Sequence, residues 1–456
     1  MARIPKELLE KYDRAGPRYT SYPPATRFHP GVGAAEYRSA LGVLERGAEV
    51  ALYLHIPFCE RRCAYCGCHA IPTPKRSVGK AYLERCLREM ELAAASAPRR
   101  IRASAVHLGG GTPTYLAPEE VEMAISGIRR IFDVPPAAEV AVEVDPRVTT
   151  EAHLDALRRA GANRISIGIQ DTSPEVQEAI GRFQGRELSL GFVALCREKG
   201  FRSLNVDLVY GLPRQSPERF RRTLEDVLSV RPERFAVFGY AHVPWAKPHQ
   251  KRIDARELPG PAARLELYTL AHEVLTGAGY RHIGMDHFAL PEDELSRAQD
   301  EGRLGRNFMG YTPRRDARCL GFGVSSIGEL FSGYFQNEKK LSRYYERVER
   351  GDLPIERGFL TGEDDRLRRF VIREILCNLR VDIPEVEAGF AVRFQERFAR
   401  EAAELAELQA DGLVEVSEES IRVTELGRLF LRNVAMVFDR YLRESPPAPA
   451  TYSRTI

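Results

Sequence analysis

The chain has 456 residues, of which 43% are hydrophobic and 29% are charged, and its formal net charge is +3. This length suits one large domain and a smaller one, and the small net charge argues against a nucleic-acid or membrane partner. The polar start MARIPKELLEKYDRAG lacks the apolar segment of a signal peptide, and no apolar run approaches the roughly 20 residues that a membrane span needs. We therefore expect a cytoplasmic protein.

Before residue 49 lies an extension, 1–48, whose segment PRYTSYPPATRFHP is too rich in proline and aromatic residues for a helix. We expect this extension to pack over the mouth of the domain that follows.

Six short apolar runs then alternate with longer amphipathic stretches such as TEAHLDALRRAG, whose apolar residues recur every three or four positions. This alternation predicts parallel strands covered by helices. Nearly every run ends in a polar or glycine-rich motif, as in a TIM-type barrel, whereas a doubly wound sheet would concentrate such motifs at one switch point. We therefore favour an α/β fold with a partial TIM-type (β/α)6 barrel over 49–245; its predicted strands are 51–56, 104–110, 139–145, 164–170, 204–211 and 234–240.

The remaining chain divides into two segments. Residues 246–355 are less regular, and we expect them, including GMDHFALP and RNFMGYT, to form barrel-completing loops and helices at the active site. Residues 356–456 predict a mostly helical, winged-helix-like C-terminal domain, in which LVEVSEESIRV forms two short strands and TELGRLFLRNVAMVFDRYL one last helix. Acidic residues offset the basic ones here, so a lid or packing role is favoured over DNA binding.

The stretch HIPFCERRCAYCGC holds four cysteines, and Cys59, Cys63 and Cys66 follow C-x3-C-x2-C spacing. Thiolates this close on one loop suit three corners of an iron–sulfur cluster. Cys68 is separated from Cys66 by one residue, so it would reach the fourth corner only with strain. Zinc is the main alternative, but it usually takes two C-x2-C pairs or additional histidines. A disulfide or inert thiols are also conceivable, and we favour a cluster with one open iron.

The spacing closely resembles that of radical S-adenosylmethionine (SAM) enzymes. In that superfamily the open iron binds SAM, which is reduced to methionine and a 5′-deoxyadenosyl radical. The glycine-rich GGGTPTYL, at 109–116, lets backbone amides approach a ligand closely, although a ligand-free tight turn would look the same. Glu143, Gln170 and Asp207 lie near strand ends, where they could bind a ribose or amino group or merely cap a helix.

Over nearly the whole chain, motifs such as PRYTSYP, HIPFCERRCAYCGC, HLGGGTPTYL, DLVYGLP, RNFMGYT and GFGVSSIG resemble the oxygen-independent coproporphyrinogen III dehydrogenase family. Related heme chaperones usually have an aromatic residue where Cys68 stands. The resemblance implies a 4Fe-4S cluster held by the three cysteines and two SAM molecules. It implies Tyr53, Gly110, Glu143 and Ile327 for the cluster-bound SAM, and Tyr65, Gly111, Thr112, Gln170, Arg182, Asp207 and Ala241 for the second. Leu108 and Gly239 depart from the Trp and Asn of some members.

The implied reaction converts the ring A and ring B propionates of coproporphyrinogen III to vinyl groups, giving protoporphyrinogen IX for heme biosynthesis. Each propionate would lose a β-hydrogen, CO2 and one electron. Arginines pair well with carboxylates, so Arg18 and Arg306 are candidates for substrate binding, although either could be a surface ion pair. Cys68 and His55 are candidate catalytic residues, and His55 could either buffer a proton or hold the loop.

Three other functions remain open: a heme-binding chaperone, a radical SAM heme-modifying enzyme and an electron-transfer ferredoxin. The last is disfavoured because no well-placed fourth cysteine exists. We expect a monomer that takes electrons from a reduced flavodoxin- or ferredoxin-type donor, whose identity the sequence does not give.

Overall fold

The computed structural model describes residues 6–45, 47–316, 318–444 and 452–455. The chain forms two compact units, each assembled from separate segments. The barrel unit consists of Phe28–Val274 and Ala317–Leu360, and the helical unit consists of Met1–Arg27, Leu275–Asp316 and Thr361–Ile456. The four-segment division expected from the sequence stays a prediction.

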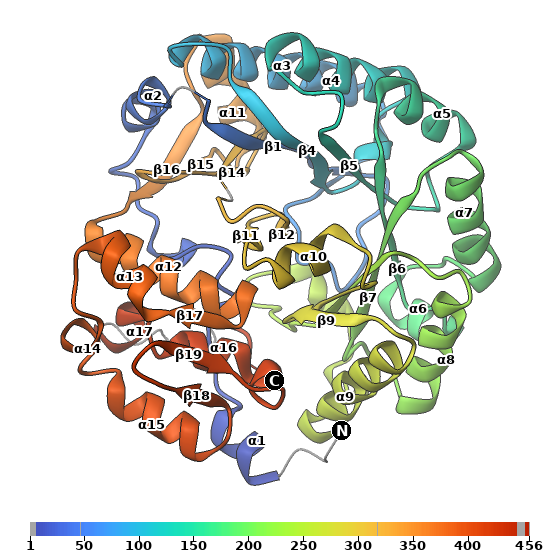
Figure 1. Ribbon diagram of the computed structural model, residues 1–456. Helices are drawn as coiled ribbons and strands as arrows, with labels where there is room; N and C mark the ends of the chain where they lie inside the picture. The colour runs from blue at the N-terminus through green and yellow to red at the C-terminus, as the bar shows by residue number, and fades with distance from the viewer. Residues whose placement is uncertain (1–5, 46, 317, 445–451, 456) are drawn as a thin grey trace. The chain divides into compact units, whose positions relative to one another are not determined.

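Six parallel strands, adjacent in chain order, form the centre of the barrel unit (Figure 1). They are β1 (Glu49–Ile56), β4 (Arg102–Gly110), β5 (Glu139–Val144), β6 (Arg164–Gln170), β7 (Ser203–Tyr210) and β8 (Arg234–Gly239). Their interiors are nearly continuous apolar runs, as strands buried on both faces require. The six predicted strands and their parallel order are confirmed.

Helices connect these strands and lie along the outside of the sheet (Figure 1). Each buries an apolar stripe; in α8, for example, the stripe consists of Phe220, Leu224 and Val227. The helices are α3 (Val78–Ser96), α4 (Pro118–Ile131), α5 (Glu151–Ala160), α6 (Pro174–Ile180), α7 (Arg186–Glu198) and α8 (Pro217–Leu228), with α9 (Pro261–Gly277) after β8. All six parallel strands therefore direct their C-terminal ends to one side of the unit.

The sheet continues beyond β1 into a segment expected to be loops and helices. Strand β13 (Cys319–Phe322) runs parallel to β1, and β14 (Ile327–Leu330), β15 (Gly333–Asn337) and β16 (Ile355–Leu360) follow in antiparallel order. Helices α2 (Ala34–Gly42) and α11 (Leu341–Glu349) belong to the same unit. The sheet extension was missed because its strands are short and glycine-rich, which hides their alternation.

The helical unit contains α1 (Lys6–Tyr12), α10 (Glu294–Asp300), α12 (Glu363–Asn378), α13 (Ile383–Phe390), α14 (Phe394–Arg397) and α15 (Ala402–Ala410). The two predicted C-terminal strands are confirmed as β18 (Val414–Val416) and β19 (Ser420–Val423), and an unpredicted β17 (Arg380–Asp382) completes a three-stranded sheet. A helical domain with this small sheet agrees with the winged-helix-like prediction.

Two local predictions in the helical unit were wrong. The expected single last helix is broken into η5 (Gly427–Phe430), α16 (Leu431–Met436) and α17 (Arg440–Glu444). Buried Asp439 accepts a hydrogen bond from the backbone N–H of Tyr441 (2.9 Å), which starts a new helix there. The segments GMDHFALP and RNFMGYT contribute to two short hairpins, β9 (Arg281–Gly284) with β10 (His287–Ala289) and β11 (Gly305–Asn307) with β12 (Gly310–Thr312).

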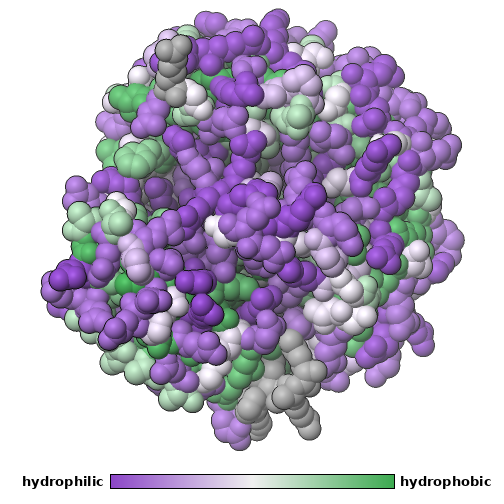
Figure 2. Space-filling view, viewed as in Figure 1, coloured by the Kyte–Doolittle hydropathy of each residue, from purple (hydrophilic) through white to green (hydrophobic). Residues whose placement is uncertain are grey.

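Within the described ranges, no helix is both long enough and apolar enough to cross a bilayer. The face in Figure 2 is mostly hydrophilic, with smaller hydrophobic areas.

Candidate active site

The cysteine loop lies between β1 and α3, and its ends form a two-stranded pair, β2 (Phe58–Cys59) with β3 (Ile71–Pro72). Cys59 Sγ lies 3.4 Å from the Thr112 hydroxyl, while Cys63 Sγ lies 3.6 Å from Arg147 Nη2 and 3.7 Å from Arg182 Nη1. A hydrogen bond from Cys68 lowers the pKa of the Cys66 thiol to about 6 and outweighs burial, which acts in the opposite direction. The loop therefore presents three thiols to polar and cationic groups at the barrel's strand ends.

The loop backbone is tied to the segment that contains η3 (Pro248–Arg252). His249 Nε2 donates to the carbonyl of Cys66 (2.8 Å), and Gln250 Nε2 donates to that of Tyr65 (3.0 Å). Lys247 Nζ donates to the carbonyl of Cys68 (3.2 Å). These contacts fix the conformation of a loop with little regular structure. Sequence reasoning missed all three side chains, because a long-range contact to a carbonyl leaves no sequence motif.

His55, the penultimate residue of β1, is a neutral imidazole in this setting because burial lowers its pKa to about 4. Nε2 lies 2.9 Å from the carbonyl oxygen of His69, which only accepts, so the proton is on Nε2. Nδ1 therefore accepts a hydrogen bond from the Tyr53 hydroxyl (2.9 Å). The ring thus joins the end of β1 to the far side of the cysteine loop.

The glycine-rich turn after β4 brings backbone close to its neighbours. Gly110 has φ +118°, and a Cβ there would lie 2.6 Å from the His55 ring. A Cβ on Gly111 would lie 2.6 Å from the carbonyl oxygen of Pro57, and the Gly111 amide donates to the carbonyl of Ile56 (2.8 Å). Only glycine fits these positions without displacing backbone. The turn thus approaches the cysteine loop as closely as backbone allows.

Glu143 of β5 is held by groups from β4. Its Oε1 lies 2.9 Å from His107 Nε2, and its Oε2 accepts the backbone N–H of Gly110 (3.1 Å). Removal from bulk water alone would raise the pKa of Glu143, but these hydrogen bonds outweigh it and lower the pKa below its usual value. Glu143 is therefore a carboxylate able to bind a cationic amino group. His107, which sequence reasoning missed, lies opposite Tyr53 in the strand register.

Arg182 reaches the same side of the barrel unit and is buried. Its Nη1 lies 3.1 Å from Asp145 Oδ2, and its Nη2 donates to the carbonyl of Gly168 (2.6 Å). Arg147 also binds Asp145, at 2.6 Å. Burial would raise the pKa of Asp145, but the two guanidiniums hold it near 2. Two cations thus share one anion, leaving positive charge beside Cys63. Asp145 and Arg147 were missed, although both lie in EVDPR, beside Glu143.

The surroundings of Asp207 in β7 raise the pKa of its carboxyl group, whereas those of Asp145 lower it. Burial, followed by repulsion from Glu143, raises its pKa to about 7. Asn205 Nδ2 and the Ser166 hydroxyl donate to its carboxyl oxygens at 2.7 and 3.3 Å. Gln170, the last residue of β6, has φ +72°, a conformation that residues other than glycine rarely adopt. Strained backbone of this kind is typical of ligand-binding sites.

The remaining predicted residues divide between the units. Ala241 follows β8, and its carbonyl accepts from Gln250 Nε2 (3.2 Å); Ile327 begins β14. Both belong to the barrel unit, like every predicted cluster and SAM ligand. Arg18 and Arg306 belong to the helical unit, where Arg18 Nη1 pairs with Asp286 (2.6 Å) and Arg306 is buried beside Tyr311.

The donor set fits a cluster better than a single metal ion. In the part of the chain that the structure describes, no three His, Cys, Asp or Glu side chains are grouped closely enough to hold one ion. An iron–sulfur cluster separates its thiolates by its own width, whereas zinc needs them almost in contact. The cationic Arg147 and Arg182 also suit the negative charge of a thiolate-bound cluster.

Comparison with known proteins gives the same result. The Radical SAM superfamily model matches residues 53–227, and the HemN C-terminal domain model matches residues 362–430. The oxygen-independent coproporphyrinogen III oxidase of Escherichia coli is 42% identical over 438 residues, covering 96% of this chain and 95% of the relative. The chain belongs to the oxygen-independent coproporphyrinogen III oxidase family.

A second relative and a solved structure match this chain over a similar length. The Pseudomonas aeruginosa oxidase is 40% identical over 439 residues. The solved structure of the E. coli oxidase superimposes with a TM-score of 0.91 at 41% identity, covering 96% of this chain and 99% of that chain. Membership in this radical SAM family confirms the α/β fold class, the 4Fe-4S cluster and SAM as cofactor.

Proposed function

We propose that this protein catalyses the oxidative decarboxylation of the ring A and ring B propionates of coproporphyrinogen III, giving protoporphyrinogen IX in heme biosynthesis. The relatives that match 96% of the chain carry the name of this activity. The observation that carries the proposal is structural: a loop with Cys59, Cys63 and Cys66 lies against a glycine turn and an ionised Glu143.

When bound, the cluster and SAM supply the radical that removes a β-hydrogen from a propionate. In our proposal Cys59, Cys63 and Cys66 hold the cluster. Glu143, with its lowered pKa, binds the amino group of the cluster-bound SAM, and the backbone of Gly110 lies close enough to contact the same group. Tyr53 and Ile327 line this site.

A second SAM would lie on the side of Arg182 and Asp207. Arg182 carries a buried positive charge suited to a carboxylate, and Asp207 can donate or accept a hydrogen bond because its pKa is about 7. The proposed ligands of this second molecule are Tyr65, Gly111, Thr112, Gln170, Arg182, Asp207 and Ala241.

The roles of the two remaining candidates differ. The neutral His55 joins Tyr53 to the cysteine loop, so we assign it to holding the loop, the second of the two roles considered. Cys68, two positions after Cys66, is proposed to act near the substrate or in electron transfer and not as a cluster ligand. Arg18 and Arg306 are proposed to bind substrate carboxylates. The proposal also includes a cytoplasmic monomer reduced by a flavodoxin- or ferredoxin-type protein.

The test is an anaerobic assay of the reconstituted protein with SAM, dithionite and coproporphyrinogen III, followed by chromatography. The proposal predicts vinyl products, with one 5′-deoxyadenosine for each vinyl group formed. Cleavage of SAM with heme, but not with porphyrinogen, would indicate a heme-modifying enzyme. An intact cluster that never cleaves SAM would indicate a heme-binding chaperone.

A further inference from the structure

A small pocket in the helical unit is lined by an unusual concentration of arginines. We call it the Arg306 pocket; its lining residues are Tyr19, Thr20, Ser21, Tyr22, Arg306, Arg369, Ile372, Arg373 and Leu376. The four residues from α12 follow an i, i+3, i+4, i+7 pattern and so share one face of that helix. Arg306 comes from β11, and the other four are consecutive residues of the PRYTSYP motif, outside any helix or strand.

Arg306 is the reason to expect an anion here. Arg306 is only 6% exposed, yet its Nε and Nη1 atoms have no hydrogen-bond partner among the described residues. A guanidinium stays charged at all physiological pH values, and leaving its donors unpaired in the interior is costly. The guanidinium lies 4.9 Å from the centre of the Tyr311 ring, and the Tyr311 hydroxyl donates to the carbonyl of Leu376 (2.9 Å). The cation is therefore held in place against the pocket wall.

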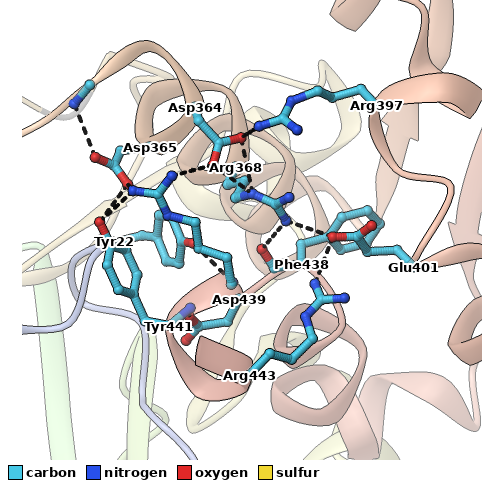
Figure 3. Close-up of polar contacts among 12 residues, drawn as sticks. Tyr22, Asp364, Asp365, Arg368, Arg397, Glu401, Phe438, Asp439, Tyr441 and Arg443 are labelled. Carbon is cyan, nitrogen blue, oxygen red and sulfur yellow. Dashed lines mark hydrogen bonds and ion pairs between the residues drawn. The ribbon is translucent and has the colours of Figure 1, made fainter. Parts of the chain in front are cut away.

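Nearby carboxylates are committed to other partners. Asp286 pairs with Arg18, and Asp439 accepts from the Tyr19 hydroxyl (3.0 Å). Asp364 lies among guanidiniums that include Arg368 and Arg397, as Figure 3 shows. The residues that line the pocket include three arginines and, within the described chain, no acidic side chain. The pocket is thus lined by three cationic side chains, and Arg306 contributes two donors that have no partner among the described residues.

The size and chemistry of the pocket select the ligand. The pocket is far too small to enclose a whole tetrapyrrole, so only a small group such as one carboxylate-bearing arm can enter it. Ile372 and Leu376 supply an apolar wall, and the arginines supply donors that match a carboxylate. We propose that the Arg306 pocket binds one propionate arm of the tetrapyrrole substrate, with Arg306 pairing its carboxylate. This inference rests on the proposed function and adds a carboxylate subsite built by α12 and the PRYTSYP segment.

The test compares Arg306→Gln and Arg373→Gln with Arg366→Gln, which removes the same charge from α12 outside the pocket. Binding of coproporphyrin III, the stable oxidised form of the substrate, is measured by its fluorescence on the reconstituted protein. Each pocket variant should raise Kd about 10-fold or more, as expected for loss of a charged hydrogen-bonded pair, and Arg366→Gln should not. The tetramethyl ester of the porphyrin should bind wild type and pocket variants equally weakly.

SAM cleavage in the absence of porphyrin should be the same in wild type and Arg366→Gln, because Arg366 belongs neither to the pocket nor to the predicted SAM ligands. Equal Kd values in wild type and both pocket variants would overturn the propionate subsite while leaving the decarboxylase intact. Binding of inorganic phosphate that depends on Arg306 but does not compete with coproporphyrin III would also overturn it, since the pocket would then hold a free anion.

Arg306→Lys, which keeps the charge, should recover part of the affinity and shows that the fold survives a change at this buried position. A wild type that cleaves SAM but never converts porphyrinogen would instead contradict the proposed function.

Discussion

The guanidinium of Arg182 lies 3.1 Å from the carboxylate of Asp145, and both side chains are buried. Their charges are balanced inside the barrel unit only while both are present, because an unpaired buried charge is strongly destabilising. Arg147 binds the same carboxylate, so the three side chains act as one group next to the Cys63 thiol.

Asp145→Ala should therefore lower the free energy of unfolding by about 3 kcal/mol, since the buried guanidinium of Arg182 and the half-buried one of Arg147 lose their shared anion. The matched control is Glu346→Ala, which breaks an exposed pair with Arg350 and should change stability by about 0.5 kcal/mol or less. Urea unfolding followed by circular dichroism measures both. Equal effects of the two substitutions would show that the Asp145 pair is not buried in solution.

Cys66 and Cys68 should behave differently although only Gly67 separates them. Cys66→Ala should abolish the cluster, measured as iron and sulfide content and visible absorbance after anaerobic reconstitution. Cys68→Ala should keep the cluster, because the proposed ligands are Cys59, Cys63 and Cys66. Cys196→Ala, at a buried position in α7, controls for the loss of a thiol elsewhere. A Cys68→Ala protein without iron would make Cys68 a ligand.

Glu143→Gln should weaken SAM binding to the reconstituted protein about 10-fold, because a neutral amide binds an ammonium group less strongly than a carboxylate does. Equilibrium dialysis with labelled SAM measures the change. Glu139→Gln, at the start of the same strand and paired with Arg164 (2.7 Å), is the control and should leave SAM affinity unchanged. Unaltered affinity in Glu143→Gln would remove Glu143 from the SAM site.

Glu89 should make the stability of the barrel unit depend on pH. It accepts hydrogen bonds from the Gly323 amide (2.8 Å), Asn337 Nδ2 (2.6 Å) and the Tyr344 hydroxyl (2.6 Å), but burial still raises its pKa to about 7. The folded pKa exceeds the unfolded value of about 4.3, so the folded state binds more protons between these values. The free energy of unfolding should therefore fall as pH rises from about 4.3 to about 7, by about 4 kcal/mol at most, and level off above pH 7.

Urea unfolding of wild type and Glu89→Gln at pH 5 and pH 8 tests this dependence. The wild type should lose more stability between the two pH values than the variant, which has no titrating group at this position. The variant itself should be less stable at pH 5, because the amide replaces an oxygen that accepts hydrogen bonds. A pH dependence of the same size in both proteins would mean that Glu89 does not titrate in this range.

The sequence predicted the parts of the fold whose physical cause is local. The six parallel strands are apolar runs of β-branched and aromatic residues, and each one ends at a motif that the structure places at the site. The cysteine spacing, the glycine turn at 109–111 and Glu143 were identifiable for the same reason, since each is a short pattern at a strand end.

What the sequence did not predict depends on contacts between distant segments. His249 and Gln250 bind carbonyls of the cysteine loop 183 and 185 positions earlier in the chain, and any carbonyl can accept such a bond. The break before α17 depends on Asp439, a residue type common at many positions. The Arg306 pocket combines three segments of the chain, so Arg306 was singled out from the sequence, while Arg369 and Arg373 were not.

The measurement that tests the central claim most directly uses coproporphyrinogen III deuterated at the β-carbons of its propionates. The reconstituted protein is incubated with this substrate, SAM and dithionite under anaerobic conditions, and the 5′-deoxyadenosine is analysed by mass spectrometry. We predict that 5′-deoxyadenosine carries one deuterium and that vinyl products form alongside it. Unlabelled 5′-deoxyadenosine, with the propionates intact, would contradict the assignment of this protein as a coproporphyrinogen III decarboxylase.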